Sequence, residues 1–188
     1  MKKTIIGAAL AAAAFIPAAA MAQEAAPDGT PAFGIEPYVA VMGGYHDFDS
    51  DNQGPLTSRC NAGAGCPDGA ILEGLAGINV PLGPVFVGVE GNVAKGFKGI
   101  DWEYGAHVRS GFRAGDSGLF YTKVGYTWVD TKDKGKDDNW SYGLGVEVGP
   151  KDIGLGGLTG PAGPRLRFEV TSYDFHSIRP TAGVVFAF

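Results

Sequence analysis

The sequence is poor in the side chains that most often hold metals or perform thiol chemistry. Its 188 residues include two cysteines and three histidines. Cys60 and Cys66 lie close together, with no histidine and no second cysteine pair beside them. A structural zinc site usually needs about four such ligands, so a metal site is the weaker interpretation of this pair. In an exported protein, a Cys60–Cys66 disulfide is expected instead.

An excess of positive charge is also missing. The chain carries 15 Lys and Arg residues against 20 Asp and Glu residues, which gives a formal net charge of -5 at pH 7. Domains that bind nucleic acid present a basic surface to the phosphates. We therefore expect no nucleic-acid partner.

Long apolar runs are absent after residue 22. The one such run, Thr4–Ala19, follows the basic residues Lys2 and Lys3 and precedes the small-residue stretch Ala20–Ala22. This order is typical of a secretory signal peptide. We expect cleavage after Ala22, and an uncleaved anchor helix is the weaker alternative. Cleavage removes both lysines, so the formal charge of the mature chain changes from -5 to -7.

What the sequence does contain is alternation. Eight stretches place apolar residues at every second position, which is the period of a β-strand with two different faces. The stretches are rich in aromatic and β-branched residues, and Gly, Pro, Asn and Asp separate them. We expect eight strands, over Ile35–Phe48, Ala70–Pro81, Val85–Ala94, Asp101–Arg113, Leu119–Asp130, Trp140–Gly149, Arg165–Tyr173 and Ser177–Phe188.

The fourth stretch shows the two faces clearly. Its even positions include Trp102 and Val108, whereas its odd positions include Glu103 and Arg109. A soluble barrel buries the apolar face, and a membrane barrel turns that face towards lipid. Periodicity alone does not distinguish the two.

The aromatic residues favour the membrane. All three tryptophans fall at one level of the predicted strands, beside polar connections, and four tyrosines join them. Rings with one polar edge settle at the membrane–water interface. This predicted aromatic girdle consists of Tyr45, Trp102, Tyr104, Tyr126, Trp128, Trp140 and Tyr142. Phenylalanines at the opposite strand ends predict an inner girdle of Phe112, Phe120, Phe186 and Phe188.

The polar faces carry five acids and five bases. An eight-stranded barrel has an interior that side chains just fill, and unpaired charges in it would be costly. The near balance of charge therefore predicts a paired network that plugs the lumen. Its members are Glu73, Glu90, Glu103, Glu147, Glu169, Arg109, Arg113, Lys123, Arg167 and Arg179.

The connections between the stretches differ in length and character. Pro81–Pro84 and Ala114–Gly118 are read as tight turns, and residues 49–69 and 130–139 are read as long polar loops on the opposite side. The connection Pro150–Pro164 is longer than the other turns, and the sequence offers no reason for it. Short turns on one side and long loops on the other are typical of an outer-membrane barrel with both termini in the periplasm.

With these features the chain resembles the opacity-protein-like outer-membrane β-barrel family, which is similar to the transmembrane half of outer-membrane protein A. The matching stretches are PYVAVMGGYHDF, VFVGVEGN and YTKVGYTW, within a region from about Phe33 to Phe188. The resemblance implies an all-β fold, an eight-stranded antiparallel up-and-down transmembrane β-barrel over residues 35–188. A cleaved signal peptide, residues 1–22, and a short periplasmic segment, residues 23–34, would precede it. The terminal Phe186 and Phe188 resemble the signal that the barrel-assembly machinery of such proteins reads.

Three histidines, His46, His107 and His176, raise the alternative of a lipid-A-modifying enzyme. Such an enzyme needs a base, a nucleophile and an orienting acid within hydrogen-bond reach. His107 shares a face with Glu103, but Ser110 has the opposite parity, and no serine motif surrounds His46 or His176. The sequence therefore predicts no catalytic site and no cofactor.

One acidic stretch partly matches a calcium-binding loop. Asp47, Asp49 and Asp51 have the spacing that opens such a loop. Asn52 then replaces the turn glycine, and Ser58 replaces the bidentate glutamate. We expect a solvated acidic loop, with divalent ions bridging it to lipopolysaccharide as an alternative.

Together these features predict a non-catalytic bacterial outer-membrane protein with a structural or surface-interaction role through its extracellular loops. A narrow pore for ions or small solutes is the main alternative. The expected partners are outer-membrane lipids and lipopolysaccharide, the barrel-assembly machinery, and a surface ligand of the loops.

Overall fold

The computed structural model describes residues 34–48, 68–97, 99–114, 118–132, 135–149, 164–175 and 177–188. The predicted signal peptide, the predicted Cys60–Cys66 disulfide, most of the acidic loop and the connection 150–163 lie outside these residues. Among the described residues, no helix is long and apolar enough to cross a bilayer.

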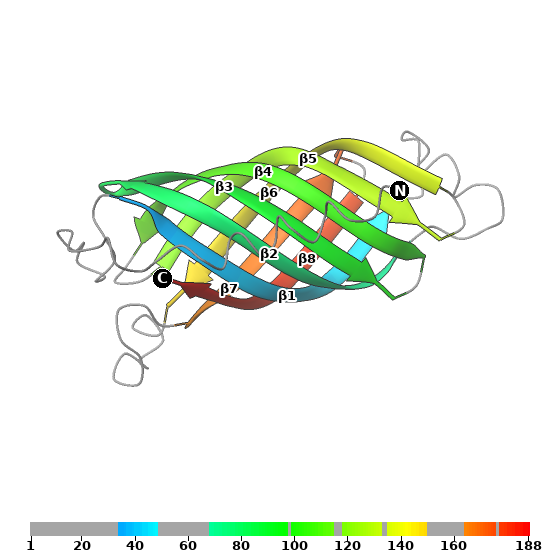
Figure 1. Ribbon diagram of the computed structural model, residues 1–188, viewed down its shortest axis with the longest axis horizontal. Coiled ribbons are helices and arrows are strands. Elements are labelled where there is room, and N and C mark those ends of the chain that lie inside the picture. Colours follow the sequence, from blue (N-terminus) through cyan, green and yellow to red (C-terminus); the bar gives the residue numbers. More distant parts are fainter. Residues whose placement is uncertain are drawn as a thin grey trace, which may run out of the picture.

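Eight strands form a closed barrel in which every strand pairs antiparallel with its neighbours in the chain and β8 returns to pair with β1. They are β1 (Glu36–Phe48), β2 (Gly69–Leu82), β3 (Val85–Gly96), β4 (Ile100–Ala114), β5 (Gly118–Thr131), β6 (Gly135–Val148), β7 (Pro164–Tyr173) and β8 (Ser177–Ala187). Figure 1 shows the strands crossing the barrel obliquely, as closure of a twisted sheet requires. The predicted fold class is confirmed.

The two ends of the barrel differ. At one end, here called the terminal end, β1 begins, β8 ends and Gly83 turns the chain from β2 into β3 with a φ of 73°. The opposite end is called the tryptophan end, because Trp102, Trp128 and Trp140 lie towards it. The C-terminus marks the terminal end, on the left of Figure 1.

The predicted long loop at residues 130–139 is wrong. β6 begins at Gly135, which pairs with Thr131, so β5 and β6 form a hairpin that continues past the tryptophans. Lys136 contacts Asp130 across this hairpin at 2.8 Å. Polar residues on both faces carry no alternation signal when both faces are wet, which is why the sequence pattern missed the extension. The other predicted strand bounds agree with the structure to within two residues.

The two faces of the wall have opposite character. Val108 and Leu144 point outwards and are 56% and 65% exposed, whereas Arg109 points inwards and is 0% exposed. The same alternation runs along β3, β5 and β7. The barrel is therefore apolar outside and charged inside, which is the arrangement of a transmembrane barrel and the reverse of a soluble one. The periodicity alone did not decide this point.

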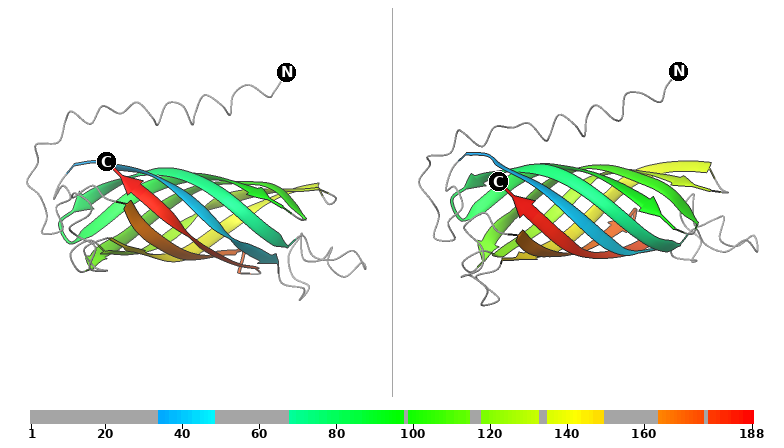
Figure 2. Two further views of the ribbon diagram at one scale, coloured as in Figure 1. Left: turned by 90° about the horizontal axis from the view of Figure 1, so that it is seen from below. Right: turned by 60° about the horizontal axis from the view of Figure 1, so that its bottom comes forward.

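The seam that closes the barrel has one interruption. β1 pairs with β8 from Tyr38 to Gly44 and again at Asp47 and Phe48, and the ladder is broken in between, opposite Arg179 and Pro180. Proline has no N–H to donate to a ladder, which accounts for the break. Both views in Figure 2 show β1 and β8 side by side along this seam.

Candidate functional site

The lumen holds the charged residues that alternation predicted. Nine of the ten predicted members are buried, and the side chain of the tenth, Arg113, is 9% exposed. The structure adds two charged residues that the sequence analysis missed, Glu36 and Arg165, so six acids face six bases. Arg165 lies on the same face of β7 as Arg167, so the alternation along this strand could have identified it as a lumen residue. Glu36 is the first residue of β1, a strand whose inward face is otherwise largely apolar, so no alternation of charge marks it.

Most of these charges meet in one group, here called the central cluster, which consists of Glu90, Glu147, Glu169, Arg109, Lys123, Arg165 and Arg167. Glu90 receives three cations: Arg167 at 2.6 Å, Lys123 at 3.2 Å and Arg109 at 3.3 Å. Arg109 and Arg167 also hold Glu147, at 2.9 Å and 2.7 Å. Because β3, β4, β5, β6 and β7 supply these five residues, the cluster ties together strands on different sides of the lumen.

Two tyrosines complete the central cluster. Tyr38 donates its hydroxyl to Glu90 at 2.8 Å, and Tyr121 donates to Glu169 at 2.7 Å. The guanidinium of Arg109 lies 3.9 Å from the centre of the Tyr121 ring, a distance at which a cation is attracted to an aromatic face. Each buried carboxylate thus has several donors, which offsets the cost of removing it from water.

Glycines make room for these tyrosine rings. Gly145 is the cross-strand partner of Tyr121, and a Cβ at Gly145 would lie 2.2 Å from the Tyr121 ring. Gly77 has the same relation to Tyr38, with 2.3 Å to its hydroxyl. The missing side chains let the two rings lie flat over the neighbouring strand and reach their carboxylates.

A second group lies towards the tryptophan end. Arg179 approaches Glu73 at 2.9 Å and Glu103 at 3.1 Å. Nδ1 of His46 lies 2.5 Å from Oε1 of Glu103, and Nε2 of His46 lies 3.0 Å from Oγ of Ser177. The sequence shows no serine motif around His46, and this contact comes from a distant part of the chain. Ser177 is 131 residues away in the chain and reaches His46 only because β8 closes the barrel against β1.

His107 faces the lumen, as its parity predicted, but its hydrogen-bond partners differ from those of His46. Its Nε2 lies 2.9 Å from Oγ of Ser141, which in turn lies 2.8 Å from the hydroxyl of Thr127. His107 and Glu103 share a face without a hydrogen bond between them among the interactions of the described residues. His176 lies outside the described residues.

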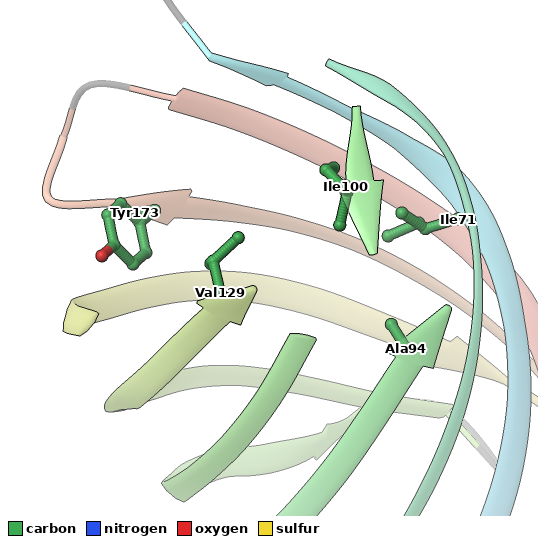
Figure 3. Packing of buried hydrophobic residues seen from close by; sticks show 5 residues of the cluster. All are labelled: Ile71, Ala94, Ile100, Val129 and Tyr173. Carbon is green, nitrogen blue, oxygen red and sulfur yellow. The ribbon is translucent and has the colours of Figure 1, made fainter. Parts of the chain in front are cut away.

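The lumen is not charged throughout. Ile71, Ala94, Ile100, Val129 and Tyr173, from β2, β3, β4, β5 and β7, point inwards near the tryptophan end, and Figure 3 shows their side chains converging. This group, here called the apolar cluster, was not predicted, because apolar residues had been assigned to the lipid face. Together the two kinds of cluster fill the barrel interior with side chains over much of its length.

The seven residues of the predicted aromatic girdle lie on the outer face. Trp102, Trp128 and Trp140 are 37%, 44% and 53% exposed. The ring of Tyr126 makes edge contacts with Trp128 and Trp140, with centroids 5.2 Å and 5.9 Å apart. The hydroxyls of Tyr45 and Tyr126 bond to Asp68 and Asp138, both at 2.5 Å. Trp102 stacks on Tyr104, and Tyr142 stacks on Phe175.

The phenylalanines expected at the other interface also lie outside. Phe112 and Phe120 stack with centroids 5.6 Å apart and are about half exposed. Phe186 and Phe188 are 46% and 64% exposed. Phe188 follows the last strand residue, and its N–H donates to the carbonyl of Pro37 on β1 at 3.0 Å.

The described residues contain no group of three or more His, Cys, Asp or Glu side chains placed to hold a metal ion.

Comparison with known proteins gives matches of fold only. No protein-family model matches the chain, and no curated protein matches it significantly. Among solved structures it is similar to Ail, the attachment invasion locus protein of Yersinia pestis, with 14% identity, a TM-score of 0.45 and coverage of 83% of this chain and 99% of Ail. Neisserial surface protein A gives 14% identity, a TM-score of 0.41 and coverage of 82% and 99%. A de novo designed transmembrane β-barrel gives 14%, 0.42 and coverage of 82% and 96%.

At this level of similarity no role is carried over from these proteins, and the fold of the chain rests on its own strand pairing. What the pairing, the lipid-facing wall and the filled lumen establish together is a small closed barrel of the transmembrane kind.

Proposed function

We propose that this protein is a bacterial outer-membrane β-barrel whose role is structural and surface-interacting, exercised through the connections at its tryptophan end. The observation that carries the proposal is the combination of an apolar outer wall with an interior closed by paired charges.

The outer wall supports the membrane location. Apolar side chains are exposed on all eight strands, and aromatic rings border them towards both ends. Soluble monomers rarely expose apolar surface of this extent. The signal-peptide pattern of residues 1–22 supports export, and in bacteria a closed barrel with a lipid-facing wall belongs to the outer membrane.

The filled interior supports a role other than transport. Arg109, Arg167 and Glu90 reach across the lumen and have side chains that are 0% exposed. A water-filled pore would leave such groups hydrated. The proposed partners are therefore those that can touch the outside of the barrel: lipids and lipopolysaccharide along the wall, a surface ligand at the connections, and the assembly machinery at the last strand.

Planar-bilayer recording of the purified protein tests the proposal against the narrow pore. We expect no steady conductance from the native protein. The Arg109→Ala/Arg167→Ala double variant removes the two side chains that span the lumen and should conduct at least in bursts. The matched control is the removal of two charges from the β5–β6 hairpin, Asp130→Ala/Lys136→Ala, which should behave as the native protein does. Steady single-channel currents from the native barrel would favour the pore and reject the proposal.

A further inference from the structure

We propose that Ser177, His46 and Glu103 form a nucleophilic site that cleaves carboxylic esters of membrane lipids, an activity separate from the surface role proposed above. The three residues lie on β8, β1 and β4, far apart in the chain, and closure of the barrel brings them together. Sequence motifs of serine hydrolases do not apply here, since such sites are recognised by geometry and not by chain order.

The geometry is that of a nucleophile, a base and an orienting acid. Oγ of Ser177 lies 3.0 Å from Nε2 of His46, and Nδ1 of His46 lies 2.5 Å from Oε1 of Glu103. With a proton on Nδ1, the imidazole donates to Glu103, and its Nε2 accepts the hydrogen bond from the Ser177 hydroxyl and then its proton. Arg179 lies 3.1 Å from the other oxygen of Glu103 and keeps that carboxylate in place.

A second serine–histidine pair in the same lumen, Ser141 and His107, lacks the orienting carboxylate that His46 has. Nε2 of His107 lies 2.9 Å from Oγ of Ser141, a distance close to that at His46. No carboxylate contacts Nδ1 of His107, and that atom has no hydrogen-bond partner in the described part of the chain. The orienting acid is therefore specific to His46, and the Ser141 pair serves as an internal reference.

The site lies directly behind the weak point of the seam. The β1–β8 ladder is broken opposite Arg179 and Pro180, between Gly44–Thr181 and Asp47–Ile178. Ser177 and His46 are 4% and 1% exposed, so a substrate reaches them only when the seam parts. Parting at this point opens the site sideways to the wall beside Tyr45, at the interface level, where the ester groups of lipids lie.

The surroundings suit an acyl chain. Tyr173, whose backbone N–H donates to Oγ of Ser177 at 3.0 Å, belongs to the apolar cluster with Ile71 and Ile100. An ester with a fatty-acid chain could thus place its carbonyl at Ser177 and its hydrocarbon on lipid-facing or apolar-cluster side chains. The substrate class is a fatty-acid ester of an outer-leaflet lipid.

The reaction balances with water as the only co-reactant. Oγ of Ser177 attacks the ester carbonyl carbon while its proton moves to Nε2 of His46. The bond from carbon to the alcohol oxygen breaks, and the leaving alcohol takes that proton. Water then attacks the acyl-serine, gives one proton to His46 and releases the fatty acid. His46 returns its proton to Oγ of Ser177.

Labelling with an alkyl fluorophosphonate tests the site, since an activated serine displaces fluoride from this probe. The protein is folded in detergent, and only the heat-modifiable, folded band is scored. We expect labelling of the native barrel, no labelling of Ser177→Ala, and a loss on the order of a thousand-fold in rate for His46→Ala. Ser141→Ala is the matched control and should label at the native rate. Absence of label on the native barrel, or label that survives Ser177→Ala, would overturn the proposal.

Glu103 acts through His46 and is tested as a positioning residue. Glu103→Gln should slow labelling at least tenfold and change its pH profile, while Glu103→Asp should restore part of the rate. Equal rates for the native protein and Glu103→Gln in the folded band would contradict its assignment.

The route through the seam is tested by a disulfide lock. Asp47 and Ile178 are paired across the seam, so oxidation of the Asp47→Cys/Ile178→Cys variant should stop labelling and reduction should restore it. The same lock across β6 and β7, Leu144→Cys/Val170→Cys, should have no effect. Labelling that continues in the locked seam variant would reject the sideways route.

Fatty-acid release identifies the lipid. The barrel is reconstituted once in phosphatidylethanolamine vesicles and once with lipopolysaccharide, and Ser177→Ala is run beside each. Release from one mixture alone assigns that lipid as the substrate, and release from both assigns a general lipid esterase. No release from either, beyond the Ser177→Ala background, would reject the proposed activity.

Discussion

At the scale of single residues, the inward glycines are as informative as the charges. The ring of Tyr121 occupies the space that a side chain at Gly145 would need. Gly145→Ala should therefore displace Tyr121 from Glu169 and lower the free energy of unfolding by about 1–3 kcal/mol, the usual cost of overpacking. Urea unfolding in detergent measures this change.

Gly74 provides the control for that experiment. It faces outwards, and a Cβ there would meet nothing within 4 Å. Gly74→Ala should change the free energy of unfolding by less than about 0.5 kcal/mol. If both alanine variants lower the free energy of unfolding equally, the effect comes from the glycine backbone and not from the space that Tyr121 needs.

Glu90 is the residue on which the central cluster depends most. Replacing it with alanine leaves Arg109, Lys123 and Arg167 without a shared carboxylate in a dry interior. Glu90→Ala should cost about 3–5 kcal/mol, as expected when one partner of a buried ion pair is removed. Asp130→Ala, which removes an acid from the exposed hairpin, should leave the midpoint of the same titration in place. An unchanged midpoint for Glu90→Ala would show that the lumen is hydrated at this level.

Parity predicted which side chains face inwards but not how they pair. Glu90 and Arg167 are 77 positions apart, and nothing in either strand alone indicates their contact at 2.6 Å. Likewise, the contact between Ser177 and His46 depends on the β1–β8 register and on closure of the barrel. The apolar cluster was not predicted because apolar side chains were expected on the lipid face, whereas Ile71 and Val129 point into the lumen.

At the scale of strands, the pattern located all eight elements because each crosses lipid with one face and meets charges with the other. It failed where a strand leaves the membrane. The extension of β6 from Gly135 to Asn139 pairs with β5 although its residues are polar on both faces. Alternation of apolar and polar residues therefore indicates where a strand enters and leaves the lipid. Where the strand itself ends depends on its hydrogen bonds to the neighbouring strand.

The last strand yields a prediction about assembly. Phe188 is 64% exposed, and its only described backbone bond goes to Pro37. Phe188→Ala should lower the stability of the refolded barrel by roughly 1–3 kcal/mol at most. It should lower the yield of folded protein in the outer membrane much more, because the incoming strand end is what the assembly machinery would recognise.

The measurement compares protease-resistant, heat-modifiable barrel in membranes with unfolding in detergent. Phe112→Ala, at the same interface but inside the wall, is the matched control and should affect both readouts to a similar degree. Normal yield in cells together with a large loss of stability would contradict a role of Phe188 in assembly.

At the scale of the molecule, the orientation in the membrane follows from the two kinds of end. The hairpin beyond Trp128 and Trp140 should face outside, and the Gly83 turn should face the periplasm. A cysteine at Lys132 should react with a membrane-impermeant maleimide on intact cells, and one at Pro84 should react only after the outer membrane is opened. Both positions lie in exposed turns, so reversed labelling would reverse the topology.

The charges that cross the lumen also determine how long the folded barrel persists. Contacts such as Arg167–Glu90 join strands that lie four apart in the barrel, on opposite sides of the lumen, so they form late, when the sheet curls up to close. Interactions absent from the folding transition state leave the folding rate nearly unchanged and slow unfolding by their full contribution. The paired charges inside the barrel should therefore slow unfolding while leaving the folding rate nearly unchanged. The folded barrel should then persist for long periods at denaturant concentrations at which the unfolded state is favoured at equilibrium.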